Sequence, residues 1–112
     1  MELLFAYGTI TKEYQLPIMG NSSLVARVCT ITGYSYYLSF EKYLIKDDSD
    51  RRVEGDLLMV PKSVLKNLDK YLGCGFICDR LPIKVVYAGQ AYSVWSYLYR
   101  LEELPEYLTL VD

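Results

Sequence analysis

The residues with the clearest chemical potential lie near the start of the chain, in the stretch Leu3–Ile10. An apolar segment with strand composition ends there at Gly8, and a buried strand that runs into a glycine turn leaves several backbone N–H groups without ladder partners. When such N–H groups point the same way, they form a concave site for an anion. Glycine suits this position because a side chain would obstruct the approach of a carboxylate to the backbone. The stretch therefore predicts a backbone site for a small anion.

Proton transfer in this chain must use groups other than histidine. The sequence contains no His, which excludes Ser-His-Asp and Cys-His arrangements and removes the commonest general base. Carboxylates, Tyr, Lys and Cys remain as candidates for acid or base chemistry.

The chain has three cysteines, Cys29, Cys74 and Cys78. An odd number of cysteines in a sequence without a secretory signal does not indicate a disulfide framework. Cys74 and Cys78 could form a local bridge or supply two ligands to a metal ion. Without a second pair or a His, however, a tetrahedral metal site cannot be completed. We therefore expect neither a metal nor a cofactor.

The pattern of apolar residues predicts the elements that must position these groups. Residues 23–40 are dense in Val, Ile, Thr and Tyr, with a bend expected at Gly33, and shorter strands are predicted over 3–7, 43–46 and 53–60. Apolar residues at helical spacing predict one main helix over 61–72, followed by strands over 76–87 and 91–99 with a hairpin turn between them. This order predicts the α+β class, as a small mixed β-barrel of five to six strands whose mouth is covered by the helix and loops. The length suits a single domain over residues 1–112.

Composition and charge restrict the partners. Hydrophobic residues make up 52% of the chain, but no apolar stretch approaches the roughly 18 residues that a membrane span needs. The net charge is −2, and the basic residues are scattered among acids, which disfavours nucleic acid as a partner. We therefore expect a cytoplasmic protein with no membrane and no nucleic-acid partner.

Five motifs, in sequence order, resemble those of the γ-glutamylcyclotransferase-like proteins, also called AIG2-like proteins. The first is similar to the family's Tyr-Gly-Ser/Thr-Leu loop after a strand, and the fourth to its Leu-Asp-x-x-Glu-Gly helix end. Together the motifs span roughly residues 3–99. They are Leu4-Phe5-Ala6-Tyr7-Gly8-Thr9-Ile10, Ile31-Thr32-Gly33-Tyr34, Val53-Glu54-Gly55-Asp56-Leu57, Leu68-Asp69-Lys70-Tyr71-Leu72-Gly73 and Val94-Trp95-Ser96-Tyr97.

The resemblance implies a small mixed β-barrel with a cavity for a γ-glutamyl or other small carboxylate ligand. Active members of the family cyclise the γ-glutamyl group: the α-amine attacks the side-chain carbonyl, 5-oxoproline forms and an amine leaves. The residues that the resemblance carries over as substrate-binding are Tyr7, Gly8, Thr9, Ile10, Leu72 and Tyr97.

The position of the family's catalytic Glu holds Leu72, and an isobutyl group neither accepts nor donates a proton. The catalytic residue is therefore unknown from the sequence. Asp69, on a neighbouring face of the same predicted helix, is a candidate substitute, and Asp56 and Asp79 are two others, although most carboxylates are exposed. Three functions stay open: a cyclotransferase with a relocated carboxylate, a module that binds its ligand without turnover, and an interaction protein that uses its Tyr-rich face, for example as a homodimer.

Overall fold

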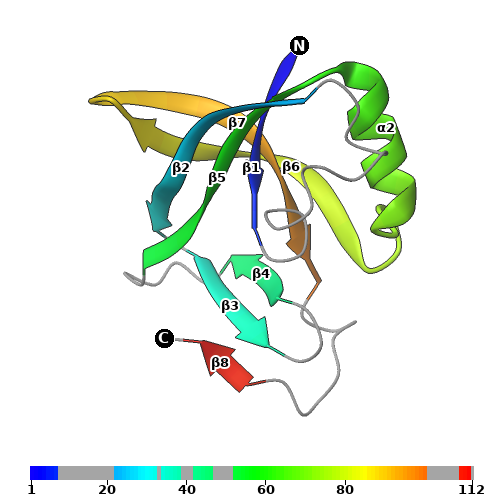
Figure 1. Cartoon of the computed structure of the whole chain (residues 1–112). Helices are drawn as coiled ribbons and strands as arrows, with labels where there is room; N and C mark the ends of the chain where they lie inside the picture. The colour runs from blue at the N-terminus through cyan, green and yellow to red at the C-terminus, as the bar shows by residue number, and fades with distance from the viewer. Residues whose placement is uncertain (8–21, 33, 39–41, 47–51, 101–108, 112) are drawn as a thin grey trace.

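The computed structural model describes residues 1–7, 22–32, 34–38, 42–46, 52–100 and 109–111 (Figure 1). The strands form a five-stranded sheet of order β2-β5-β1-β7-β6 and a three-stranded sheet of order β4-β3-β8. Figure 1 shows α2 at one side of the larger sheet and the smaller sheet below it. In chain order the elements are β1 (Glu2–Ala6), β2 (Ser23–Thr32), β3 (Tyr34–Leu38), β4 (Lys42–Lys46), β5 (Arg52–Val60), α2 (Lys62–Tyr71), β6 (Cys78–Tyr87), β7 (Gln90–Tyr99) and β8 (Thr109–Val111).

Strand β1 lies in the middle of the larger sheet. It is antiparallel to β5 on one side and parallel to β7 on the other. A strand with neighbours on both edges and packing on both faces needs a continuous apolar run, and Leu4, Phe5 and Ala6 are each at most 1% exposed. Tyr7, which follows directly, is also buried, so the end of β1 is fixed within the core.

Gly55 allows β5 to approach the end of β1 closely. A Cβ atom at this position would lie 2.5 Å from the carbonyl oxygen of Ala6 and 2.6 Å from Cζ of Phe5. No other residue type can occupy the position without moving the backbone of β1 or the Phe5 ring.

Helix α2 turns one apolar stripe toward the sheet and ends in a Schellman motif. The helix follows Pro61, which has an extended backbone. At its other end Gly73 adopts a φ of 73°; its N–H donates to the carbonyl oxygen of Lys70 at 3.3 Å, while that of Cys74 donates to the carbonyl oxygen of Asp69 at 2.8 Å. These two bonds satisfy carbonyl groups that the end of a helix otherwise leaves unpaired. The buried stripe consists of Val64, Leu65 and Leu68.

One row of side chains crosses four strands of the larger sheet, because register partners in adjacent strands share a face. Leu4 of β1 pairs with Trp95 of β7, so Ala6 and Tyr97, two residues further along these parallel strands, are neighbours too. Ala6 also pairs with a residue of β5, and Tyr97 with a residue of β6. In order across the strands, the row is Asp56, Ala6, Tyr97 and Arg80.

The predicted α+β class is confirmed, with two differences in the arrangement of strands. The described part of the chain holds eight strands rather than five to six, and the larger sheet is not closed into a barrel there. The single long strand predicted over 23–40 is divided near position 33, because β2 joins the larger sheet and β3 the smaller one. Strand β8, which pairs with β3, was not predicted. In the described part, no helix has the length and apolar character that a membrane crossing requires.

Candidate functional site

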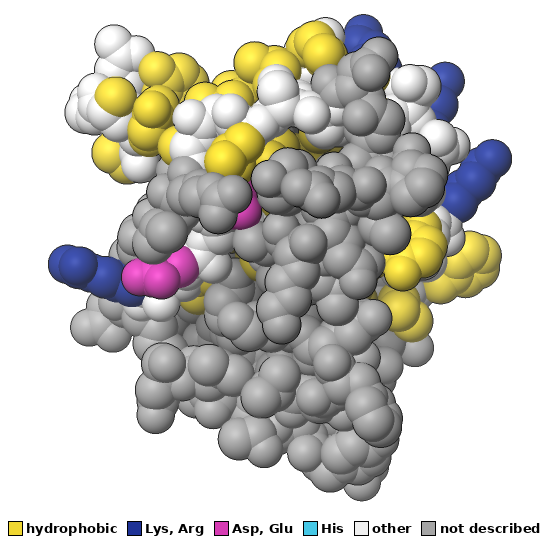
Figure 2. Space-filling view, in the orientation of Figure 1, with side chains coloured by type: hydrophobic (Ala, Val, Ile, Leu, Met, Phe, Trp, Pro, Cys, Tyr) yellow, Lys and Arg dark blue, Asp and Glu magenta, His cyan; other side chains and the backbone are white. Residues whose placement is uncertain are grey.

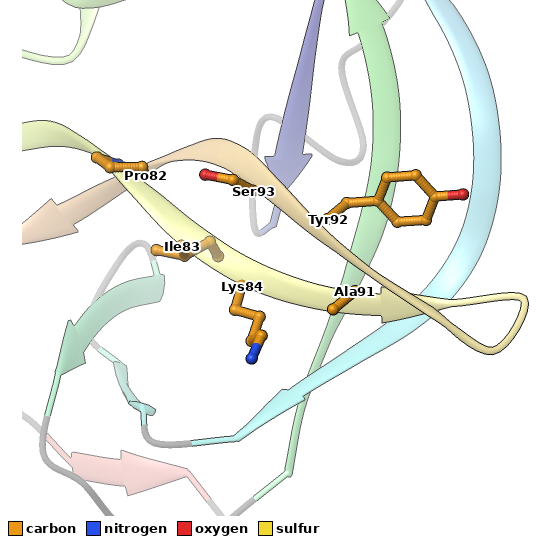
Figure 3. Close-up of a pocket in the computed structure, with 6 residues that line it drawn as sticks. All are labelled: Pro82, Ile83, Lys84, Ala91, Tyr92 and Ser93. Atoms are coloured by element: carbon orange, nitrogen blue, oxygen red, sulfur yellow. The ribbon is translucent and has the colours of Figure 1, made fainter.

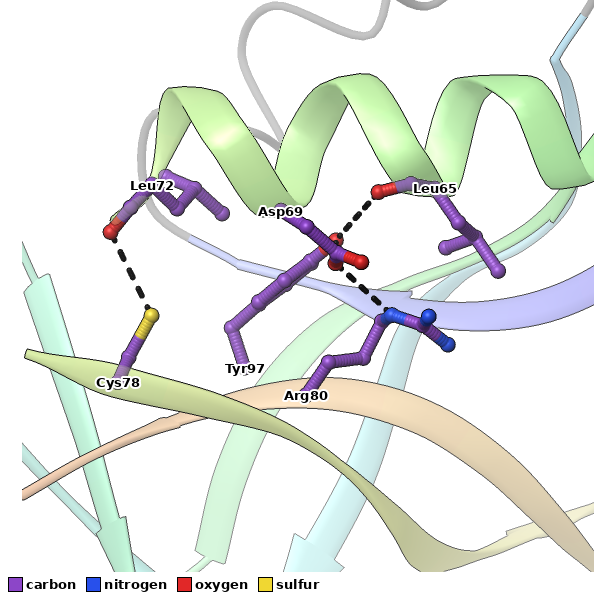
Figure 4. Close-up of polar contacts among 6 residues, drawn as sticks. All are labelled: Leu65, Asp69, Leu72, Cys78, Arg80 and Tyr97. Carbon is purple, nitrogen blue, oxygen red and sulfur yellow. Dashed lines mark hydrogen bonds and ion pairs between the residues drawn. The ribbon is translucent and has the colours of Figure 1, made fainter. Parts of the chain in front are cut away.

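Tyr97 connects the end of β1 to helix α2. Its ring is 1% exposed, and its hydroxyl donates a hydrogen bond to Oδ1 of Asp69 at 2.7 Å, with the carbonyl oxygen of Leu65 at 3.3 Å (Figure 4). The hydroxyl of Tyr7 donates to the backbone carbonyl of Tyr97. Burial, followed by the bond to Asp69, raises the pKa of Tyr97 above its ordinary value, so the phenol stays protonated and acts as a donor. The first strand and the second half of the helix are therefore joined through one buried tyrosine.

Asp69 receives a second donor from the neighbouring strand. Nε of Arg80 lies 2.8 Å from the same Oδ1 atom, and the two side chains are 23% and 25% exposed. The guanidinium carbon of Arg80 also lies 4.5 Å from the centroid of the Trp95 ring, within the range of a cation–π contact. The bond to Asp69 raises the pKa of Arg80 further, so the guanidinium stays protonated. Through its bonds to Arg80 and Tyr97, Asp69 holds α2 against β6 and β7.

Leu72 forms the C-terminal cap of α2. Its backbone N–H donates to the carbonyl oxygen of Leu68 at 2.9 Å, and its own carbonyl oxygen accepts a bond from Sγ of Cys78 at 3.4 Å (Figure 4). The residue is 9% exposed. Position 72 therefore holds a buried aliphatic side chain in the core, at a helix end whose backbone hydrogen bonds do not depend on the identity of that side chain.

Both cysteines next to the helix end are free thiols, so the local bridge between them is absent from the structure. Burial, then the nearby Cys74, raises the pKa of Cys78 from 9.0 to about 12. A thiol with this pKa is almost wholly protonated near neutrality and is a poor nucleophile. Cys78 is therefore a packing residue and a weak donor at the helix end.

The structure brings together four of the residues singled out by the sequence. Tyr7, Tyr97 and Asp69 are linked by hydrogen bonds, and Leu72 lies one helical turn beyond Asp69. The other three predicted binding residues, Gly8, Thr9 and Ile10, lie outside the described residues.

The three candidate carboxylates have different surroundings. Asp69 is engaged as described above. Asp79 is on the surface, where Arg100 donates to both of its oxygens at 2.9 and 3.0 Å; these bonds hold the pKa of Asp79 below its ordinary value. Asp56, in contrast, is only 7% exposed. Of the three, only Asp56 is buried without a hydrogen-bonding partner among the residues that the structure describes.

Sequence reasoning missed that Arg80 is the partner of Asp69. A signal was present in the hairpin. Once the turn is placed between Tyr87 and Gln90, counting back along both strands sets Arg80 opposite Tyr97. The identity of the acid that approaches this pair depends on the placement of the helix, which the hairpin does not specify.

A separate pocket of about 390 Å³ lies on the β6–β7 hairpin (Figure 3). Among the described residues, its lining includes none of the binding residues predicted from the sequence, and one charged group, the Lys84 ammonium. No described lining residue of this pocket takes part in the hydrogen bonds around Tyr97. The lining residues are Pro82, Ile83, Lys84, Ala91, Tyr92 and Ser93.

Charged groups are dispersed over the described surface. In the view of Figure 2, Lys and Arg side chains stand separately at the periphery and acidic side chains are few. Within the described ranges, no three His, Cys, Asp or Glu residues come close enough to hold a metal ion.

The chain is an α+β protein with a mixed sheet and one described helix. Tyr97 connects the end of β1 to the second half of α2 through hydrogen bonds. The family described as gamma-glutamyl cyclotransferase, AIG2-like, matches residues 4–110, and the chain belongs to this family. No curated protein matches the sequence.

Solved structures share the fold at low sequence identity. An AIG2-like protein from Mus musculus is similar with a TM-score of 0.77 and 19% identity, covering 91% of this chain and 81% of that one. Protein ytfP from Escherichia coli has a TM-score of 0.71 and 22% identity, with 97% and 90% covered. A gamma-glutamyl cyclotransferase has a TM-score of 0.71 and 19% identity, with 88% and 66% covered.

Proposed function

We propose that this protein binds small γ-glutamyl compounds beside the end of β1 and cyclises them to 5-oxoproline with release of an amine. Family membership over residues 4–110 supports the class of ligand. The observation that carries the proposal is the hydrogen-bonded link from Tyr7 through Tyr97 to Asp69. This link joins the two places where the family resemblance puts the binding loop and the acid.

The reaction needs a loop that binds the carboxylate of the ligand and a group that moves one proton. Gly8, Thr9 and Ile10 are proposed to supply the backbone donors, with Tyr7 and Leu72 flanking the ligand. Leu72 cannot move a proton. Asp69 already accepts two hydrogen bonds at Oδ1, and its proposed part is to hold the helix end in place.

The purified protein should be incubated with a panel of γ-glutamyl amino acids and γ-glutamyl amines, and 5-oxoproline measured by mass spectrometry. Product above the buffer blank would support cyclisation. A matched panel with Leu72→Glu tests whether the site is otherwise competent, because this variant supplies an acid at the family's position. If neither protein forms product, cyclisation at this site is excluded.

A second candidate function is ligand binding without turnover. The observation that favours it is the buried, aliphatic Leu72 at the helix end, which removes a charge that would repel an anion. Calorimetry with the same panel should then show saturable binding without product. Replacing Gly8 with Val should weaken that binding, because a side chain there blocks the approach to the backbone. Unchanged affinity in Gly8→Val would rule out the loop as the binding element.

A further inference from the structure

Asp56 is a buried carboxylate without a partner. The residue is 7% exposed. Within the described part of the chain, no donor bonds to its side chain and no cation pairs with it. Burying an ionised carboxylate without a hydrogen bond or counter-charge is costly. Such groups are rare in folded proteins, and each one calls for an explanation in terms of function, water or an ion.

The place of Asp56 in the sheet points to a ligand. Asp56 pairs with Ala6, directly before Tyr7 and the predicted binding loop. Its side chain shares the face on which Tyr97 reaches α2, because Asp56, Ala6 and Tyr97 belong to one row. Adjacent strands lie about 4.8 Å apart, so the backbones at Asp56 and Tyr97 are about 10 Å apart. In the register of the sheet, Ala6 lies between them.

The charges along this row are arranged asymmetrically. On the far side of Tyr97, the positive Arg80 is neutralised by Asp69 at 2.8 Å. On the near side, the negative Asp56 has no counter-charge among the described residues. A cationic group placed over Ala6 would complete the row without disturbing the ion pair beyond it.

We propose that Asp56 receives the α-ammonium group of a γ-glutamyl ligand and is the proton acceptor of this chain, in place of the acid that Leu72 replaces. This inference rests on the proposed function and assigns the proton acceptor that the proposed function leaves open. The carboxylate takes one proton from the α-ammonium, and the freed amine forms a C–N bond with the side-chain carbonyl carbon. The C–N bond to the leaving amine then breaks, and Asp56 returns its proton to that nitrogen. The ring nitrogen passes its second proton to the released amine, Asp56 ends as it began, and the products are 5-oxoproline and an ammonium ion.

Two matched ligands test the binding half of this proposal. γ-Glutamylalanine carries the α-ammonium group, and glutarylalanine is the same molecule without it. Calorimetry at low temperature gives both affinities, and mass spectrometry of the same samples records any 5-oxoproline. The wild type should prefer γ-glutamylalanine by at least about 30-fold, since losing one partner of a buried charge pair costs that much or more.

Asp56→Asn should reduce this preference to within about twofold, because the amide keeps the shape but not the charge. Asp79→Asn is the control, since Asp79 lies on the surface with Arg100, and it should keep the full preference. If Asp56→Asn also keeps it, the inference is overturned while the proposed function stands. If the wild type binds neither ligand, the proposed function fails and the inference with it.

A second measurement needs no ligand. If the Asp56 carboxylate is unpartnered, neutralising it should stabilise the ligand-free protein. The melting temperature of Asp56→Asn at pH 8 should then exceed that of the wild type by about 4 °C or more, at the sensitivity usual for a domain of this size. A variant that melts at or below the wild-type temperature would show that Asp56 has a structural partner, and would overturn the proposal.

Discussion

Replacing Tyr97 with Phe removes one hydroxyl from the centre of the site and leaves the ring in place. That hydroxyl is 2.7 Å from Oδ1 of Asp69 and belongs to a residue 1% exposed to solvent. A buried hydrogen bond to a charged group contributes about 1.5–3 kcal/mol to stability. At about 4 °C per kcal/mol, the sensitivity for about 100 residues, Tyr97→Phe should lower the melting temperature by about 6–12 °C.

The same hairpin offers a matched control. The hydroxyl of Tyr92 donates to Oε1 of Gln90 at 3.0 Å, but this contact is exposed, so Tyr92→Phe should change the stability by about 0.5 kcal/mol at most. Thermal unfolding followed by circular dichroism compares the two variants directly. A double-mutant cycle with Asp69→Asn should show that the Tyr97 effect depends on the carboxylate. If Tyr97→Phe melts within about 2 °C of the wild type, the buried bond does not hold the helix as argued.

Three further predictions concern the backbone, a thiol and the helix cap. Gly55→Ala should destabilise the protein by about 1–3 kcal/mol or more in urea unfolding, because its Cβ would lie 2.5 Å from the Ala6 carbonyl oxygen; a loss under about 0.5 kcal/mol would contradict this packing. Folding raises the pKa of Cys78 from 9.0 to about 12, so the thiol loses its proton at lower pH in the unfolded chain than in the folded protein. The free energy of unfolding should therefore fall as the pH rises from 9.0 to about 12, and it should already drop by about 1 kcal/mol between about pH 8 and 10. Cys78→Ala should flatten that slope, and an equal slope in both proteins would exclude the thiol as its source. In an Asp56→Asn background, which lacks the proposed proton acceptor, Leu72→Glu should raise cyclisation of the best γ-glutamyl substrate by about 10²–10⁴-fold, as measured by 5-oxoproline release, with circular dichroism to check folding; turnover no faster than that of Asp56→Asn alone would count against the proposed site.

The sequence predicted most of the elements because their signals are local. Alternating or continuous apolar runs marked β1, β5, β6 and β7, and the helical spacing from Val64 to Leu72 marked α2 within two residues of its observed ends. The hairpin turn at 88–90 was predicted from its glycine, and in the structure Gly89 adopts a φ of 77°.

The division of residues 23–40 between two sheets could not be predicted in the same way. Composition shows that a segment suits extended structure, but the choice of sheet depends on partners distant in sequence. β2 pairs with β5, and β3 pairs with β4 and β8. The same limit explains why β8 was missed and why a closed barrel was expected.

Part of the site followed from the motifs, and part required coordinates. The motifs predicted Tyr7, Tyr97 and Leu72 as site residues, because each is a residue type at a fixed place in a pattern. They could not distinguish Asp69 from Asp56, which share a residue type and differ only in surroundings. One carboxylate is satisfied by two donors and the other is buried without any, and that difference exists only in three dimensions.

The hydrogen bonds that hold the last turn of α2 do not involve the side chain at position 72. Among the described residues, the hydrogen bonds that close the turn involve main-chain atoms of the helix end: the amides of Leu72, Gly73 and Cys74, and the Leu72 carbonyl that accepts from the Cys78 sulfur. These hydrogen bonds do not depend on which side chain stands at position 72, although Leu72 also packs into the core. A substitution at position 72 would keep the main-chain hydrogen bonds of the helix end, which makes this position suitable for redesign of the site.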